Sequence, residues 1–196
     1  MACSTLLFLG GTGMSAYPPA TDLWANHRQD ALSRQLIGAA EPYSDRAIRR
    51  GRALTRLEVR RLGIDVVVVE GTTAEALRNG AGHYEETAYP GERGNVSIAG
   101  HRTTYGAPFN RIDELIPGDL IVLTTPVEKF EYRVIARPWV VEPTDWSPIR
   151  DYPMKTSLLT LTSCAPEGSD TLRIVVRALL FASHPINSST TTGGIW

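Results

Sequence analysis

The feature that most constrains the fold is a succession of short apolar runs, rich in β-branched residues and bounded by glycine, proline or aspartate, that begins near Ala53. The densest of them, IDVVVVEG at residues 64–71, favours a buried strand. Further runs of this kind are TRLEVR, GNVSIAGHR, GDLIVLTT, FEYRVIARPWVVEP, TSLLTLTSC and TLRIVVRALLF. Many short strands with few helices predict an all-β barrel or sandwich.

The N-terminal part of the chain follows a different pattern. Residues 1–21 contain no charged side chain, and their apolar stretch TLLFLGGTGMSA is shorter than the roughly 20 apolar residues that a membrane-spanning helix needs. We expect residues 1–21 to be part of a membrane anchor whose upstream half is missing from this chain; a loosely packed N-terminus is the alternative. Residues 22–52 are polar and rich in arginine, which favours a stalk or an N-terminal helix.

Two helical signals stand out from the strand pattern. Leu32, Leu36 and Ile37 are spaced as a short apolar stripe on a helix. The segment TTAEALRNG opens with a threonine cap and ends in glycine, which predicts a short helix. With 196 residues, we expect one globular domain at 53–183, followed by a flexible tail rich in Ser, Thr and Gly at 184–196.

Charge and cysteine content exclude several classes of protein. The formal net charge of -1 differs from the strongly basic surface of a nucleic-acid-binding protein, so no nucleic-acid partner is expected. The two cysteines, Cys3 and Cys164, cannot form a disulfide framework. The four histidines are scattered without the spacing of metal ligands, so neither a metal site nor another cofactor is expected.

Three residues in the sequence point to catalysis: Cys164, His101 and Arg173. Cys164 closes the run TSLLTLTSC and precedes Ala-Pro, which ends the strand because proline has no N–H to donate. A thiol at that position is either a nucleophile near a loop or an ordinary core cysteine. Thiol catalysis also needs an acid or base and a group that stabilises the oxyanion. His101 lies where another strand runs into a Gly- and Thr-rich loop.

Arg173 is the candidate for the oxyanion-stabilising group. It follows Cys164 by nine residues, so a hairpin return would bring it beside the thiol. Alternation along its strand puts Leu172, Ile174 and Val176 on one face and Arg173 on the other. Arg173 then projects into a groove, unless it is an ordinary arginine on a solvated face of the sheet.

Three strings resemble the sortase family when they are taken together in this order. They are GAGHYEETAYPGERGN at residues 80–95, AGHRTTYGAPFNRIDEL at residues 99–115, and TLTSC at residues 160–164 with an arginine nine residues further on. The form GHRTTYG resembles the class E sortases of actinobacteria. The similarity extends from about Leu54 to Phe181, which is nearly all of the expected globular domain.

The resemblance implies an eight-stranded sortase-type β-barrel with short peripheral helices, and an acyl transfer in two steps. Cys164 would attack the Thr carbonyl of an LAxTG- or LPxTG-like sorting signal, with His101 as acid/base and Arg173 at the oxyanion. An amine of lipid II or peptidoglycan would then resolve the thioacyl enzyme. The implied partners are therefore secreted proteins with a C-terminal sorting signal, and the implied location is the outer face of the cell membrane, with the N-terminal segment as anchor.

The resemblance also suggests residues that contact the substrate. Tyr105 matches a tyrosine linked in class E enzymes to a preference for Ala in the signal, although an aromatic that packs the loop is the simpler interpretation. Thr104, in the same loop, and Thr162 and Ser163, beside the nucleophile, are further candidates, and the last two hydroxyls can instead satisfy local backbone groups. His83 is expected to be a loop residue that shapes the wall of the site.

Two other enzyme classes and one non-catalytic class compete with this interpretation. An L,D-transpeptidase also pairs a histidine with a downstream cysteine, but its cysteine lies in an SHGC-type motif, whereas this chain has LTSC at residues 161–164. A papain-like protease would place the cysteine before the histidine and near a helix start. The non-catalytic alternative is a secreted β-barrel in which Cys164 is simply buried. The loop APEGSD at residues 165–170 is acidic and departs from the His-Pro pattern of class E enzymes.

Overall fold

The computed structural model describes residues 21–37, 50–150 and 155–186. Predictions on residues 1–20, 38–49 and 187–196 lie outside this described part. A helix covers residues 21–37, and the remaining helices are α2 (Ala74–Arg78), η1 (Arg60–Leu62) and η2 (Ile112–Glu114). The strands are β1 (Ala53–Val59), β2 (Ile64–Glu70), β3 (Ala81–His83), β4 (Gly94–Ala99), β5 (Leu120–Thr124), β6 (Glu128–Val134), β7 (Trp139–Val141), β8 (Ser157–Ala165) and β9 (Leu172–Pro185).

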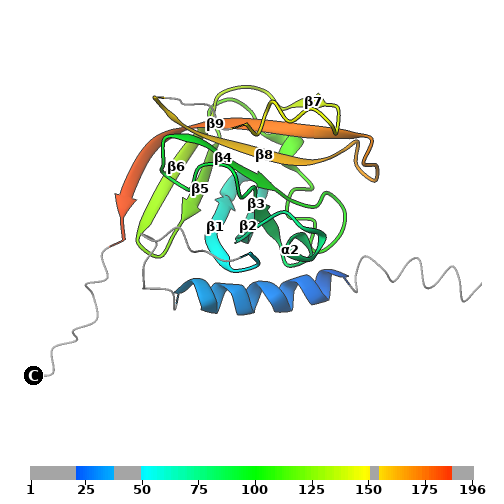
Figure 1. The fold of residues 1–196 in the computed structure, drawn as a ribbon, viewed down its shortest axis with the longest axis horizontal. Helices are drawn as coiled ribbons and strands as arrows, with labels where there is room; N and C mark the ends of the chain where they lie inside the picture. Colours follow the sequence, from blue (N-terminus) through cyan, green and yellow to red (C-terminus); the bar gives the residue numbers. More distant parts are fainter. Residues whose placement is uncertain (1–20, 38–49, 151–154, 187–196) are drawn as a thin grey trace, which may run out of the picture.

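The strands form a closed barrel with one strand added at its side (Figure 1). Their order is β6-β5-β1-β2-β3-β4-β8-β9-β7, and β6 also pairs with β9. The pairing of β6 with β9 closes a ring of eight strands, while β7 pairs only with β9 among the strands of the described chain. The predicted eight-stranded β-barrel is therefore confirmed.

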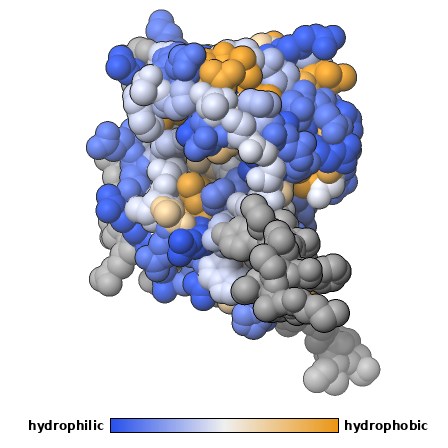
Figure 2. Space-filling model, turned by 90° about the vertical axis from the view of Figure 1, so that its right-hand side faces the viewer, coloured by the Kyte–Doolittle hydropathy of each residue, from blue (hydrophilic) through white to orange (hydrophobic). Residues whose placement is uncertain are grey.

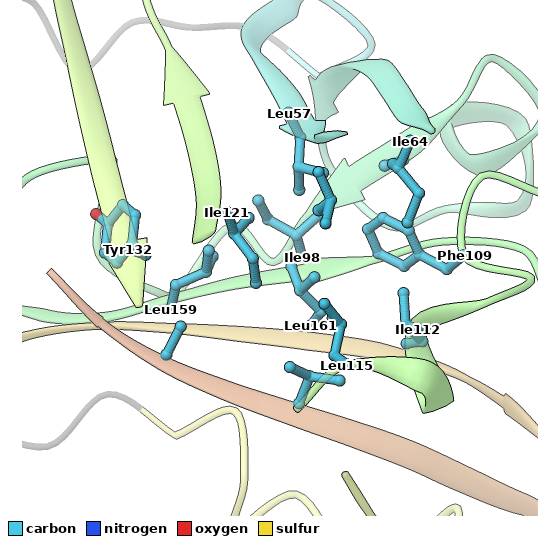
Figure 3. Packing of buried hydrophobic residues seen from close by; sticks show 14 of the residues in the cluster. Leu57, Ile64, Ile98, Phe109, Ile112, Leu115, Ile121, Tyr132, Leu159 and Leu161 are labelled. Carbon is cyan, nitrogen blue, oxygen red and sulfur yellow. The ribbon is translucent and has the colours of Figure 1, made fainter. Parts of the chain in front are cut away.

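The interior of the barrel follows from the alternation of apolar residues along each strand. Figure 3 shows inward side chains of several strands meeting those of η2 and the loop before it. Leu57, Ile98, Leu159 and Leu161 have no measurable exposure there. Phe109, from the loop after β4, fills the same core, and it lies so close to Gly100 that a Cβ there would meet its ring at 2.6 Å. That contact fixes the path of the chain as it leaves β4.

Two details of the strand pattern differ from expectation. The run FEYRVIARPWVVEP was predicted as one strand, but it forms β6 and the separate β7, because Pro138 lacks the N–H that a continuous ladder would use. The short strand β3 was not predicted. β9 extends to Pro185, so it includes the first two residues of the expected tail.

The predicted short helix is α2, and the threonine cap is confirmed. The side chain of Thr73 accepts a hydrogen bond from Ala76 N at 3.2 Å, which satisfies one of the N–H groups that the first turn leaves free. Asn79 ends the helix, and Gly80 follows it.

The helix at residues 21–37 lies along the outside of the barrel, near α2 (Figure 1). Leu32 packs in a small cluster with Val67, Val69 and Ala76. Leu36 is also buried, which agrees with the predicted stripe, but Ile37 is 80% exposed and the prediction for it is wrong. No helix in the described ranges is long and apolar enough to cross a membrane.

Side chains of this helix also form hydrogen bonds to the strands and to the end of α2, with Gln35 accepting from Ala53 N at 3.0 Å and Gln29 making three such bonds. Gln29 accepts a hydrogen bond from Val67 N at 2.6 Å, and its amide group donates to Asn79 O at 2.6 Å and to Val67 O at 3.3 Å. Val67 lies just before the residues of β2 that pair with β3, so Gln29 satisfies backbone groups that β3 does not reach. The helix is therefore hydrogen-bonded to the barrel as well as packed on it.

Candidate active site

Three neighbouring strands bring the candidate catalytic residues to one end of the barrel. β4 and β8 are parallel, with Ala99 beside Thr162, and the hydrogen bond from Gly100 N to Thr162 O at 3.1 Å continues this ladder toward His101. β8 and β9 are antiparallel, with Cys164 directly opposite Arg173. The hairpin return expected from the nine-residue spacing is thus what the structure contains.

Cys164, His101 and Arg173 all line one open groove of about 360 Å³. It lies on the outer face of β8, because Leu159 and Leu161 occupy the core while the alternate residues point away from it. Cys164 is partly exposed and is a free thiol. Its sulfur is therefore not sealed in the core.

Backbone carbonyl groups hold the guanidinium of Arg173 in place. Its Nη1 donates to Asp170 O at 2.7 Å and to Leu172 O at 2.9 Å. In the described part of the chain, Nε and Nη2 of Arg173 have no protein partner. An arginine that lines the groove, is fixed through one nitrogen and has further donors suits the stabilisation of an oxyanion.

His101 occupies a half-buried position at the start of the loop after β4. Burial lowers the pKa of its imidazole below the ordinary value, and the positive charge of Arg78 on α2 lowers this pKa further. The neutral imidazole is therefore favoured at neutral pH. Its ring lies against that of Tyr105, with centroids 5.2 Å apart and planes tilted by 39°.

The hydroxyls beside the nucleophile are occupied by hydrogen bonds. Thr162 Oγ1 lies 3.0 Å from the hydroxyl of Tyr84, and Ser163 donates to Gly100 O at 2.7 Å. Both residues border the groove. Burial raises the pKa of Tyr84, whereas its bond to Thr162 and the charge of Arg173 lower it. Sequence reasoning missed Tyr84, although it lies in the segment that resembled the family.

The segment from Pro143 to Ile149 forms the opposite wall of the groove, with Trp146, Pro148 and Ile149 among its lining residues. Buried and half-buried polar side chains on the outer faces of β4, β8 and β9 hold this wall. Asn95 Nδ2 and Arg177 Nη2 donate to Pro148 O at 2.9 and 2.7 Å, and Thr160 Oγ1 donates to Asn95 Oδ1 at 2.7 Å. The position of the wall is therefore fixed by the same three strands that carry the candidate catalytic residues.

Three predicted site residues lie elsewhere. Thr104 and Tyr105 are not among the residues that line the groove; Tyr105 instead faces His101 on one side and a second cavity on the other. The prediction for His83 is wrong, because this residue belongs to β3 and is completely buried. Its ring nitrogens lie 3.0 Å from Glu70 Oε2 and 3.0 Å from Ala88 O.

The surface around this end of the barrel is mixed in character. On the face shown in Figure 2, apolar residues are scattered among hydrophilic ones. In residues 21–37, 50–150 and 155–186, no three His, Cys, Asp or Glu side chains are grouped so that they could hold a metal ion. The groove is lined by one thiol, one imidazole, one guanidinium, the carboxylate of Asp145, several hydroxyls and many apolar side chains.

Comparison with known proteins gives a consistent result. The sequence profile of the sortase domain matches residues 57–181. The chain is 30% identical over 188 residues to sortase SrtE1 of Streptomyces coelicolor, an alignment that covers 89% of this chain and 51% of that protein. It spans about half the length of the curated relatives that it matches.

Solved structures agree with the sequence comparison. The SrtF sortase of Corynebacterium diphtheriae superposes with a TM-score of 0.70 at 28% identity, over 79% of this chain and 97% of that one. Sortase E1 of Streptomyces coelicolor, solved with a tripeptide in its active site, superposes with a TM-score of 0.63 at 32% identity, over 69% of this chain and 91% of that one.

Proposed function

The chain belongs to the sortase family, and on this premise we propose that it is a class E-like cysteine transpeptidase that acts on C-terminal sorting signals. The observation that carries the proposal is the convergence of Cys164, His101 and Arg173 on one groove from three adjacent strands. Each of the three supplies a function that acyl transfer through a thiol requires.

In the first step, the thiolate of Cys164 attacks the carbonyl carbon of Thr in an LAxTG- or LPxTG-like signal. Negative charge develops on the carbonyl oxygen, and the free donors of Arg173 stabilise it. The bond between Thr and Gly then breaks, and His101 gives its proton to the leaving amine. The product is a thioacyl enzyme and a released C-terminal fragment.

In the second step, an amine attacks the thioester carbonyl, a new amide forms, and the thiolate of Cys164 leaves. His101 accepts a proton from the attacking amine, so that both residues return to their initial states. We propose an amine of lipid II or peptidoglycan as acceptor. The reaction would then take place outside the cytoplasmic membrane on secreted proteins, with residues 1–21 as part of an anchor and 53–183 as the catalytic domain.

The protonation states of Cys164 and His101 limit the rate. Cys164 must be deprotonated and His101 protonated at the same time, and the lowered pKa of His101 reduces the protonated population at neutral pH. Only a minority of molecules therefore hold the reactive combination, and slow turnover follows.

A direct test compares two donor substrates. The protein is incubated with a fluorescent LAxTG peptide and an amine acceptor, and separately with a peptidoglycan tetrapeptide donor, while intact-protein mass spectrometry follows the acyl enzyme. We expect a thioacyl adduct and cleavage between Thr and Gly with the first substrate only. Cys164→Ala should abolish both signals.

The other outcomes separate the alternatives. Turnover of the tetrapeptide alone would identify an L,D-transpeptidase. A wild-type protein that forms no adduct with either donor and whose Cys164 resists a mild alkylating reagent would be a non-catalytic barrel.

A further inference from the structure

The loop after His101 rests on the beginning of the described N-terminal helix. Gly106 N donates to the carboxylate oxygen Oδ1 of Asp22 at 2.8 Å, and Tyr105 N donates to Thr21 Oγ1 at 3.4 Å. Both acceptors come from residues more than eighty positions earlier in the chain. The helix thus binds the backbone of the segment that follows the candidate acid/base.

That segment has a conformation that needs support. Tyr105 and Ala107 have φ angles of 54° and 42°, in the left-handed region that residues with a side chain adopt at a cost of roughly 1–3 kcal/mol. Such a backbone persists only where its surroundings hold it. The hydrogen bonds that Thr21 and Asp22 accept come from the N–H groups of Tyr105 and Gly106, within this segment.

A pocket of about 200 Å³ separates part of this loop from the N-terminal helix and from the start of β2; its lining includes Ala25, Asn26 and Gln29 of the helix and residues 105–108 of the loop. The space inside the pocket supplies no packing contacts to the loop. The contacts that hold the loop at its rim include the hydrogen bonds of Thr21 and Asp22 and a ring contact of Trp24.

A row of aromatic rings continues these contacts to the groove. The rings of Trp24 and Tyr105 form a T-shaped pair with a centroid distance of 6.0 Å and an interplanar angle of 72°. Tyr105 in turn lies against His101 at 5.2 Å. Edge-to-face pairs of this kind are worth about 0.5–1.5 kcal/mol beyond the area that they bury.

We propose that Thr21, Asp22 and Trp24 are positioning residues of the active site, which hold Tyr105 against His101 and so set the orientation and solvent exposure of the imidazole. The proposal rests on the proposed function of His101, because it assigns the helix a role in that residue's chemistry. The helix is then a working part of the site, in addition to its packing on β2 and α2.

The test uses Trp24→Ala in the full chain, with Trp24→Phe as the conservative variant. Leu23→Ala is the matched control, since Leu23 directly precedes Trp24 on the same helix and is 73% exposed. The titration of His101 is followed by NMR through its imidazole C–H signals. The charged or titratable groups around the imidazole are the same in every variant: Arg78, Tyr84, Tyr105, Asp145, Cys164 and Arg173.

Removing the Trp24 ring should let Tyr105 move away and expose His101 to water. The pKa of His101 should then rise toward its ordinary value, which by itself would enlarge the protonated population. The misplaced proton donor should outweigh that gain, so kcat/KM should fall roughly tenfold, mainly through kcat. Trp24→Phe should restore both quantities, and Leu23→Ala should match the wild type. A Trp24→Ala protein with lower thermal stability, an unchanged His101 titration and unchanged kcat/KM would overturn the proposal.

A second pair of variants tests the backbone contact without removing a ring. Asp22→Asn keeps the accepting Oδ1, whereas Asp22→Ala removes it, and both lose the same charge. We expect the titration shift and the loss of kcat/KM in Asp22→Ala only, and equal behaviour of the two variants would contradict the assignment. Because the titration needs no substrate, a protein that failed as a transpeptidase would still report whether the helix controls His101.

Discussion

The inner and outer faces of β4, β8 and β9 are built from the same strands and differ in almost every other respect. The inner face is apolar and packs in the barrel core, with Val96, Ile98, Leu159, Leu161, Ile174 and Val176. The outer face carries Asn95, Ser97, Thr160, Thr162, Cys164, Arg173 and Arg177. Most of these outer residues are also buried or half-buried, but they are polar and bonded to the wall of the groove.

Along each of these strands, residues that stabilise the core therefore alternate with residues that build the groove. Burial of apolar area stabilises the inner face, and any side chain of the right volume serves it. On the outer face a buried polar group must have a defined partner, so each residue fixes a position as well as contributing energy. Substitutions on the two faces should therefore have distinguishable consequences.

The largest effect on folding is expected from the inner face. Leu161→Ala leaves a cavity in the closed core, and the free energy of unfolding should fall by about 2–5 kcal/mol in urea denaturation. At a temperature where the variant is folded, kcat/KM should stay near the wild-type value. Leu179→Ala, an exposed position of β9, should change neither. A large loss of kcat/KM without a loss of stability would mean that the faces are not separable.

The largest effect on catalysis is expected from the outer face. Arg173→Ala removes the candidate oxyanion donor and should lower kcat/KM by about 100- to 1000-fold with little change in the unfolding free energy. Lysine should restore little, because it cannot reproduce the bonds to Asp170 O and Leu172 O with donors left over. Arg133→Ala is the matched control. The side chain of Arg133 stacks on Phe181, which lies on another part of β9.

An intermediate effect is expected from the wall. Asn95→Ala removes two hydrogen bonds to the carbonyls of Pro148 and Arg150, and should cost about 1–3 kcal/mol of stability. Because the wall would lose its fixed position, KM for the peptide should rise more than kcat falls. Ser97→Ala, which removes one bond to Ile149 O, should give a weaker form of the same result. A change in kcat alone would place Asn95 in the chemistry instead.

The smallest effect concerns the pH dependence of stability. Burial holds the pKa of His101 in the folded protein below its unfolded value, so the unfolded chain binds the proton first as the pH falls. The contribution of His101 is therefore complete above the unfolded pKa and is lost as the pH falls toward the folded one. Relative to His101→Gln, the wild type should lose unfolding free energy as the pH falls below about 6.5, the ordinary pKa of histidine. A difference that does not vary with pH would contradict the burial of the imidazole.

The inner face was accessible from the sequence, and the outer face only in part. The short strand runs, such as TSLLTLTSC and the β-branched residues of β2, predicted an all-β barrel or sandwich, because burial acts on patterns that repeat along the chain. The sortase resemblance implied the eight-stranded barrel. Cys164, His101 and Arg173 were candidates from their places near strand ends, with alternatives left open, and the sortase resemblance selected the catalytic interpretation. The register of His101 beside β8 depends on a parallel pairing with no short-range signal.

What could not be predicted depends on contacts between distant segments. Tyr84 bonds Thr162, and Arg177 bonds Pro148 O, and neither pair is marked by a local pattern. His83 looked like a loop residue, because β3 has only three residues and its partner Glu70 lies on another strand. Ile37 fitted a helical stripe, although the surface of the barrel that the helix covers does not reach it.

The parallel pairing of β4 with β8 has a consequence for how such a protein can diversify. Backbone hydrogen bonds between these strands set the register of His101 and Cys164, so the segment between β7 and β8, which carries the groove wall from Pro143 to Ile149, is not needed to set that register. Insertions, deletions or exchanges in that segment can therefore alter what the groove accepts while the reacting pair stays in register. The paired strands thus preserve the reaction, and the segment that carries the groove wall can change which substrates are accepted.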